Sequence, residues 1–203
     1  MSFFFTNLNL GYFFDIFQGL PMTKSHQRKI ENVQKLRILT VKSVDFNNKI
    51  INKNFLADYY SKTKINKDKY ILKKNDYVLT SKGKRRGLLI DSSNINEDPL
   101  LYSQHFIVLR LKPGLEDKAA FFSYLINLFI KDIPYTYSKS QVAKYTKVKD
   151  VIDFQINVGF DLEAEYKNFE KEWVIYKSAK KQFMQKEIEF ENYLRRLKNK
   201  FNS

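Results

Sequence analysis

Short apolar stretches separated by polar turns follow one another through residues 1–157 and predict β-strands. They are rich in β-branched and aromatic residues, and Asn, Asp, Gly or Pro stands at their borders, as is typical of strands. Four stretches have this composition: "LRILTVKSV" (36–44), "YILKKNDYVLT" (70–80), "GLLI" (87–90) and "HFIVLRL" (105–111).

Two other stretches of this region predict helices. "PGLEDKAAFFSYLINLFIK" (113–131) opens with Pro and Gly, carries acids in its first turn and repeats apolar residues at helical spacing, and Pro134 ends it. "SQVAKYTKVKDV" (140–151) predicts a shorter helix with Ser140 as its N-cap. Residues 1–157 are therefore expected to form one mixed domain of the α+β class.

The last part of the chain follows a different pattern, in which a series of positions recurs in steps of four and three. Ten of its twelve members are apolar, and neither Gly nor Pro interrupts it. The series is Leu162, Tyr166, Phe169, Trp173, Tyr176, Lys180, Phe183, Glu187, Phe190, Leu194, Leu197 and Phe201. Such a heptad series predicts one long coiled-coil helix, of about 40 residues and roughly 60 Å, over residues 158–203.

So long an apolar stripe needs a cover, and the sequence leaves two alternatives open. The helix could fold back on the domain, or it could pair with a second long helix, which this chain does not contain. An antiparallel pairing with its own copy sets Leu162 opposite Phe201, and Lys180 then lies within about one turn of Glu187 in the other copy. We therefore expect a homodimer through the ten apolar members of the series.

Positive charge is concentrated in the mixed domain. The chain of 203 residues has a net charge of +14; residues 1–160 hold 26 Lys and Arg against 14 Asp and Glu, whereas residues 161–203 hold 10 against 8. An excess of this kind favours a polyanionic partner, although AT-rich coding also produces Lys-rich and Asn-rich sequences.

Composition also indicates where the protein acts. The chain has no cysteine, which fits a reducing cytosol. Its apolar start, "MSFFFTNLNLGYFFDIFQGL", lacks the basic region of a signal peptide, and no run reaches the roughly 18 apolar residues of a membrane span. We expect a cytoplasmic protein without a membrane segment.

Motifs of catalysis are missing or incomplete. Gly83-Lys84 resembles part of a nucleotide-binding loop, but Arg85 follows it and no glycine stands five residues earlier. The nucleotide and hydrolase signatures G-x-G-x-x-G and G-x-S-x-G are absent, and His26 and His105 lack metal-ligand spacing. We expect no enzymatic activity, no metal and no cofactor in this chain.

One fragment resembles a metal-dependent nuclease: Asp153 with Glu165 and Lys167. Because Glu165 and Lys167 lie in a helix rich in charges, chance accounts for this pattern more simply. A second alternative is a regulatory coiled-coil adaptor whose basic surface is incidental.

Basic clusters with interleaved Gln, Ser and Tyr are candidates for contact with double-stranded DNA. Lys and Arg attract phosphates of any sequence, and Arg and Gln can also read base edges. Gly83 and Gly87 are expected to let the loop of the third cluster turn tightly. The clusters are Lys24, Arg28 and Lys29; Lys62 and Lys64; Lys82, Lys84, Arg85 and Arg86; and Lys139, Gln141 and Lys144.

The order of these elements resembles the target-recognition domain of Type I restriction-modification specificity subunits. "YILKKNDYVLTSKGKRRGLLI" is similar to its strand, turn and glycine loop, "LYSQHFIVLRLKPG" to the next strand, and "AAFFSYLINLFI" to its helix. "LGYFFDIFQGLPMTK" is similar to the family's entry and "SKSQVAKYTKVKDVIDFQI" to its closing stretch. The chain departs from the family at Asn75, where Gly is usual, and at "INVGFDLEAEYKN", which lacks the usual proline-rich junction.

Whole family members carry two recognition domains and two long helices, whereas this chain has one of each. The resemblance therefore implies a half subunit whose two-fold dimer reads a bipartite inverted repeat of DNA. It also implies that partner modification and restriction subunits perform methylation and cleavage, and that they bind adenosylmethionine and ATP.

Overall fold

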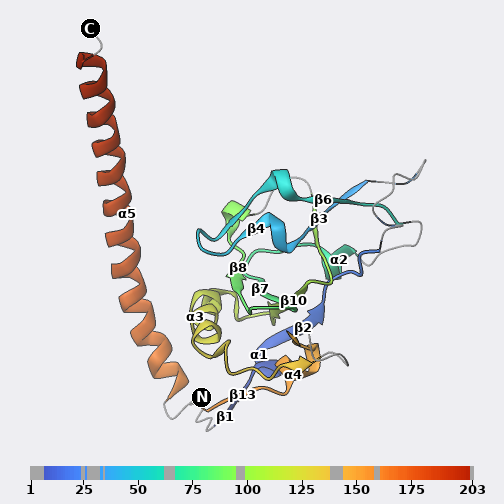
Figure 1. Cartoon of the computed structure of the whole chain (residues 1–203). Helices are drawn as coiled ribbons and strands as arrows, with labels where there is room; N and C mark the ends of the chain where they lie inside the picture. The colour runs from blue at the N-terminus through green and yellow to red at the C-terminus, as the bar shows by residue number, and fades with distance from the viewer. Residues whose placement is uncertain are drawn as a thin grey trace. The chain divides into compact units, whose positions relative to one another are not determined.

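A computed structural model describes residues 7–23, 26, 33, 35–61, 67–94, 99–137, 144–157 and 161–201. The chain divides into two compact units. Residues 6–158 form a mixed α/β domain, and the other unit contains the long helix α5 (Leu162–Phe201), both labelled in Figure 1. The predicted combination of a mixed domain and one long C-terminal helix is confirmed.

An antiparallel four-stranded sheet forms the centre of the domain. Its strands, in spatial order, are β2 (Phe14–Gln18), β10 (Phe106–Leu111), β7 (Tyr77–Thr80) and β8 (Gly87–Leu89). β10 lies between β2 and β7, so that Val108 faces Phe17 on one side and Val78 on the other. Val108 and Val78 are fully buried, which explains why the sequence of β10 is almost continuously apolar.

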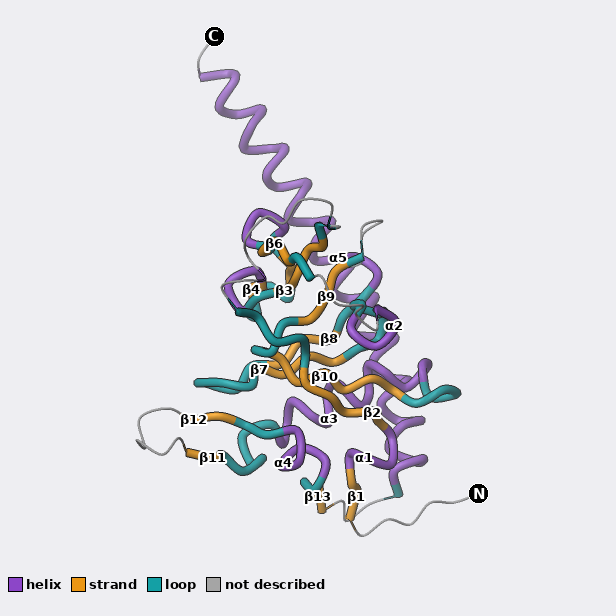
Figure 2. Tube along the Cα trace, turned by 90° about the vertical axis from the view of Figure 1, so that its right-hand side faces the viewer, coloured by secondary structure: helices purple, strands orange, loops and turns teal. Residues whose placement is uncertain are grey.

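A second sheet has three strands, with a parallel pair at its centre. It consists of β6 (Ala57–Tyr59), β3 (Leu36–Leu39) and β9 (Leu100–Tyr102). Three two-stranded ladders are also present in the domain. They pair β1 (Asn7–Asn9) with β13 (Gln155–Asn157), β4 (Val44–Asp45) with β5 (Ile50–Ile51), and β11 (Thr136–Tyr137) with β12 (Lys144–Tyr145). Figure 2 labels the strands of two of them, β1 with β13 and β11 with β12.

Short helices flank these sheets. They are α1 (Leu10–Phe13), α2 (Lys67–Tyr70), α3 (Ala119–Phe129) and α4 (Val148–Ile152), with 3-10 turns at Val41–Ser43, Lys53–Phe55, Ser92–Asn94 and Glu116–Lys118. Helix α3 packs against β8. Tyr77 of β7 reaches this helix, and its hydroxyl donates a 2.7 Å hydrogen bond to the Asn127 side chain.

Most predicted elements are present, but three are shorter than expected. The helix predicted over 113–131 covers only Ala119–Phe129 and follows a 3-10 turn at Glu116–Lys118. The stretch 36–44 contains a 3-10 turn after β3, and the stretch 70–80 is a strand only from Tyr77 onwards. The predicted helix 140–151 is wrong at residues 144–145, which form strand β12, and helical structure begins only at Val148. Ser140, its expected N-cap, lies outside the described residues.

The turn before β7 explains the shortened strand, and it holds a buried carboxylate. Asn75 adopts a left-handed conformation with φ of 70°, which Asn tolerates better than most residues. The turn directs Asp76 into the domain, where its side chain is 1% exposed. Asn75 thus fills a position for which glycine is also suited.

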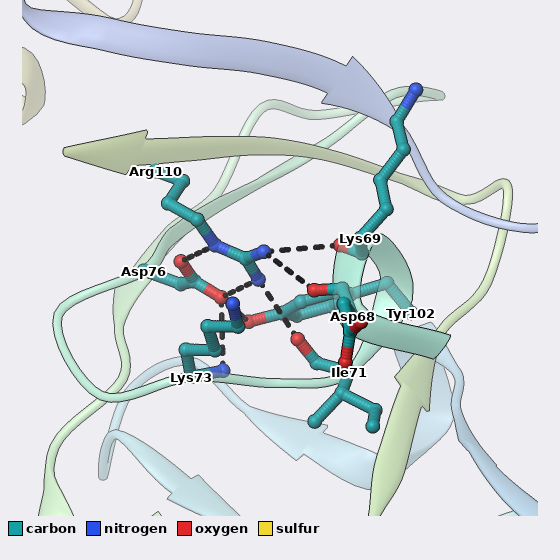
Figure 3. A network of polar contacts seen from close by, with 7 residues as sticks. All are labelled: Asp68, Lys69, Ile71, Lys73, Asp76, Tyr102 and Arg110. Carbon is teal, nitrogen blue, oxygen red and sulfur yellow. Dashed lines mark hydrogen bonds and ion pairs between the residues drawn. The ribbon is translucent and has the colours of Figure 1, made fainter. Parts of the chain in front are cut away.

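Figure 3 shows the partners that surround the Asp76 carboxylate. Arg110 of β10 binds it through two hydrogen bonds, from Nε at 2.8 Å and from one terminal nitrogen at 2.7 Å. The hydroxyl of Tyr102 donates at 2.7 Å, and the backbone N–H of Lys73 donates at 2.9 Å. A buried carboxylate is tolerated when it is paired and hydrogen-bonded in this way.

The remaining donors of Arg110 bind backbone carbonyls. They reach the oxygens of Asp68 and Lys69 in α2 at 3.2 and 3.1 Å, and that of Ile71 at 2.8 Å. Burial by itself would lower the pKa of Arg110, but the hydrogen bonds and charge of Asp76 outweigh it and raise that pKa. Burial and the charge of Asp76 raise the pKa of Tyr102, so its hydroxyl remains a donor.

Removing the charge of Asp76 is expected to destabilise the domain. Asp76→Asn leaves the largely buried guanidinium of Arg110 without its counter-ion, and should lower the free energy of unfolding by about 3 kcal/mol. Urea denaturation measures this change. Asp58→Asn is the matched control: Asp58 forms a surface pair with Lys35 at 3.0 Å and is 40% exposed. Its substitution should cost under about 1 kcal/mol, and equal costs for the two variants would contradict the assignment.

Candidate nucleic-acid interface

The loop between β7 and β8 is a tight turn that presents basic side chains to solvent. Thr80 closes it, because its hydroxyl donates to the Lys84 carbonyl and accepts from the Arg86 backbone N–H, both at 3.0 Å. Gly83 stands at the turn with φ of +71°. The side chains of Lys82, Lys84 and Arg86 are exposed.

This loop pairs with strand β12, which comes from a distant part of the sequence. Lys82 forms a β-bridge with Tyr145, and the N–H of Gly83 donates to the Lys144 carbonyl at 3.1 Å. The N–H of Thr146 donates to the Ser81 carbonyl at 2.8 Å. Two of the predicted basic clusters are therefore brought together, the one in the loop and the one that contains Lys144.

Exposed cations of the two segments form what we call the loop–hairpin surface: Lys82, Lys84, Arg86 and Lys144. None of the four forms an ion pair with a carboxylate of the described residues.

Tyrosine rings lie among these cations. The ammonium of Lys144 stands 5.8 Å from the ring centre of Tyr135 and 5.6 Å from that of Tyr137. Tyr137 is 53% exposed, at the end of β11 in the hairpin seen in Figure 2. Exposed tyrosines beside lysines can contact both bases and phosphates of a nucleic acid.

His105 lies behind the loop and does not enlarge its positive charge. Its carbonyl accepts the N–H of Ser81 at 2.8 Å. Burial, and then the nearby charge of Lys82, lower the pKa of His105 below its ordinary value. The imidazole is therefore harder to protonate than a free one, and His105 accepts a hydrogen bond from the turn through its backbone carbonyl.

Arg85 differs from its basic neighbours, and the structure removes it from the predicted DNA contacts. The residue is 7% exposed, and its Nε donates to the Thr146 hydroxyl at 2.9 Å. Its other donors bind backbone carbonyls, and its guanidinium lies 3.4 Å from the ring centre of Tyr135. Because these contacts hold the guanidinium inside the domain, Arg85 does not share the exposed surface of Lys84 and Arg86.

The other predicted contacts cannot be placed. Lys24, Arg28, Lys29, Lys62, Lys64, Lys139 and Gln141 lie outside the described residues. Thr146 and Tyr135, which hold Arg85, were not among the predicted site residues. The nearest signal in the sequence was the mixture of tyrosine and lysine around them, which does not reveal a contact across 61 positions.

No metal site or membrane helix is found in the described part of the chain. There, no group of three or more His, Asp and Glu side chains is arranged to hold a metal ion. The acidic pair of the nuclease alternative is split between the two units, since Asp153 belongs to the domain and Glu165 to α5. Among the described helices, none is long and apolar enough to cross a membrane.

Helix α5 carries the predicted apolar series along its whole length. Asp161 caps the N-terminus of the helix, because its carboxylate accepts a hydrogen bond from the backbone N–H of Glu163 at 2.9 Å. The rings of Phe169 and Trp173 stack at 5.4 Å, and those of Trp173 and Tyr176 at 5.2 Å.

Exposure of the series increases along the helix. Leu162 and Tyr166 are buried, whereas Phe183 and Phe190 are 64% and 60% exposed. The side chains of Leu194, Leu197 and Phe201 lie outside the described part. The helix itself is confirmed, and its pairing remains a prediction.

Comparisons with known proteins point to one fold. No family model matches the sequence, and no curated protein does. The chain is similar to the crystal structure of the S subunit of a Type I restriction-modification system from M. genitalium, with a TM-score of 0.50 and 13% identity. This match covers 85% of the present chain and 39% of the S subunit.

A second solved structure, described as the structural basis of complex assembly and conformational transition in the type I R-M system, has a TM-score of 0.48 and 17% identity. This second match covers 85% of the present chain and 40% of the chain in that structure. The present chain thus spans about two fifths of the solved structures that it matches. The resemblance to specificity subunits is confirmed for the fold.

Gly87 has a packing role that differs from the predicted turn. A Cβ atom at this position would lie 1.7 Å from the Tyr77 hydroxyl oxygen. Gly87→Ala should therefore displace Tyr77, break its bond to Asn127 and lower the free energy of unfolding by about 2 kcal/mol, measured by urea denaturation. A Cβ atom at Gly83 would meet nothing within 4 Å, so Gly83→Asn should cost no more than about 1 kcal/mol. A larger cost at Gly83 than at Gly87 would refute this difference.

Proposed function

We propose that this chain is a DNA-recognition subunit of a Type I restriction-modification system, in a form with one recognition domain and one long helix. The observation that carries the proposal is an exposed basic surface, without ion pairs among the described residues, on a domain whose fold is that of an S subunit.

The loop–hairpin surface is the proposed DNA contact. Lys84 and Arg86 stand on one side of the shared β-bridge and Lys144 on the other, so phosphates of one duplex can meet both segments. Cations that replace the counterions of DNA make binding strongly dependent on salt. Bases would be read by neighbouring polar and aromatic side chains, among which Tyr137 is exposed.

The proposed partner of α5 is a second copy of the same helix in antiparallel orientation. A parallel pair would place Lys180 against its own copy and Glu187 against its own copy, with like charges in the seam. The antiparallel pair brings each Lys180 near a Glu187 of the other copy. It also covers the exposed rings of Phe183 and Phe190.

A two-fold dimer of this kind carries two recognition domains and reads an inverted repeat with an unread gap. The proposed complex also includes a modification subunit, which would methylate the DNA, and a restriction subunit, which would cut it. Adenosylmethionine and ATP would be bound by those subunits in the cytoplasm. The present chain would determine the DNA sequence at which these subunits act.

Neutralising the loop is expected to weaken DNA binding and its salt dependence together. In Lys84→Gln/Arg86→Gln two phosphate contacts are lost, so the slope of log K against log salt should fall in magnitude by about 1.8. Binding of the full chain to duplex DNA, measured by fluorescence anisotropy over a salt series, gives both quantities.

The matched control neutralises two cations of α5, in Lys171→Gln/Lys181→Gln. These residues are exposed and lie outside the apolar series, so affinity and slope should stay as in the wild type. A wild-type chain without salt-dependent affinity for DNA would instead support the adaptor alternative. Equal losses in both double variants would show that only total charge matters.

Removing one ring of the series is expected to weaken the dimer. Trp173 is stacked between Phe169 and Tyr176, and Trp173→Ala removes this contact from both copies. The dissociation constant of the dimer should rise by at least about tenfold, because buried tryptophans dominate interface energies.

Analytical ultracentrifugation over a concentration series measures this constant. Val174→Ala is the control, since Val174 is 63% exposed and next to Trp173 but outside the series. If the two variants had the same effect, or if the wild type stayed monomeric, the proposed seam would be refuted.

A further inference from the structure

Arg85 stands between two exposed cations, yet its side chain enters the domain. Lys84 and Arg86 are exposed, whereas Arg85 is 7% exposed. Its position in the turn is fixed on both sides by Thr80, which bonds the backbones of Lys84 and Arg86. The loop therefore separates an internal arginine from external cations within three consecutive residues.

Arg85 connects three segments that are far apart in the sequence. From its own loop it reaches the Thr146 hydroxyl, just after β12, at 2.9 Å. It also reaches the carbonyls of Ile130 and Lys131, just after α3, at 3.4 and 3.3 Å, and the carbonyl of Pro134, just before β11. A guanidinium is suited to this task, because its five N–H donors lie in one rigid plane.

The charge of Arg85 is stabilised without a direct ion pair among the described residues. The carbonyls that follow α3 form the negative end of the helix, and the Tyr135 ring presents its face to the guanidinium. Burial lowers the pKa of Arg85, and the charges of Tyr135 and Asp150 partly oppose this effect. Asp150 itself accepts from the Thr136 hydroxyl of β11 at 3.1 Å.

The hairpin depends on such support. β11 and β12 have two residues each, and an isolated ladder of this length is not stable in water. Apart from Arg85, one β-bridge between Lys82 and Tyr145, made of two backbone hydrogen bonds, joins β12 to the loop among the described residues.

We infer that Arg85 is a positioning residue, which holds the β7–β8 loop and the β11–β12 hairpin together so that Lys84, Arg86 and Lys144 meet DNA as one prearranged surface. The part that concerns DNA rests on the proposed function. The part that concerns the hairpin rests on the contacts of Arg85 alone. Prearranged groups bind more tightly because their ordering is not a cost of binding.

The test uses Arg85→Lys in the full chain, which keeps the charge but loses most of the planar set of donors. Hydrogen exchange of the free protein, followed by mass spectrometry, should become about tenfold faster in peptides covering 81–86 and 144–147. Affinity for duplex DNA should fall about tenfold with an unchanged salt slope, since no phosphate contact is lost. Thr146→Val, which removes one acceptor of Arg85 and keeps the side-chain size, should produce smaller changes in the same direction.

Arg37→Lys is the matched control, because Arg37 belongs to β3 and donates to the Lys53 carbonyl at 3.2 Å, away from this surface. It should leave exchange in both peptides unchanged. Unchanged exchange in Arg85→Lys would overturn the inference, and so would a salt slope reduced by about 0.9, the value for one lost phosphate contact. If the wild type bound no DNA while exchange rose as expected, the proposed function would fail and the positioning of the hairpin by Arg85 would stand.

Discussion

The carboxylate of Asp76 is shared by segments of both sheets, and the arrangement of the domain depends on it. Arg110 approaches from the central sheet, Tyr102 from the second sheet, and the backbone of Lys73 from the turn between them. Taking a carboxylate out of water costs several kcal/mol, so the site is stable only when its partners are all in place. The Asp76–Arg110 pair with its hydrogen bonds therefore forms only when β7, β9, β10 and the end of α2 are correctly assembled.

A second buried arginine, Arg85, has no direct ion pair with a carboxylate of the described residues. Arg85 binds carbonyls after α3, a hydroxyl and an aromatic face, and it lies at the opposite end of β7 from Asp76. Carbonyl dipoles are fixed by the backbone, so they hold a guanidinium in one orientation without adding an anion near the surface. Lys84, Arg86 and Lys144 are exposed, and none of them forms an ion pair with a carboxylate of the described residues.

Local patterns in the sequence predicted the elements whose stability is local or periodic. The strands at 87–90 and 105–111, the helix after Pro113 and the long helix follow from composition, end signals and spacing. Strand β12 did not, because its pairing with Lys82 overrides a weak helical preference. The sequence does not indicate that Arg85, among the four cations of the loop, is the one that turns inwards. Its orientation depends on a hydrogen bond to Thr146, 61 positions away.

In helix α5 the two polar members of the apolar series, Lys180 and Glu187, cannot form an ion pair with each other within one helix. Lys180 and Glu187 are seven residues apart, which is two turns and about 10 Å, too far for a side-chain pair. In the domain, Asp76 and Arg110 satisfy each other within one chain. In the proposed antiparallel pair, each Lys180 would come within about one turn of Glu187 in the other copy. An ion pair thus joins segments of one chain in the domain. Under the proposed function, pairing of Lys180 with Glu187 would instead join two copies of the helix.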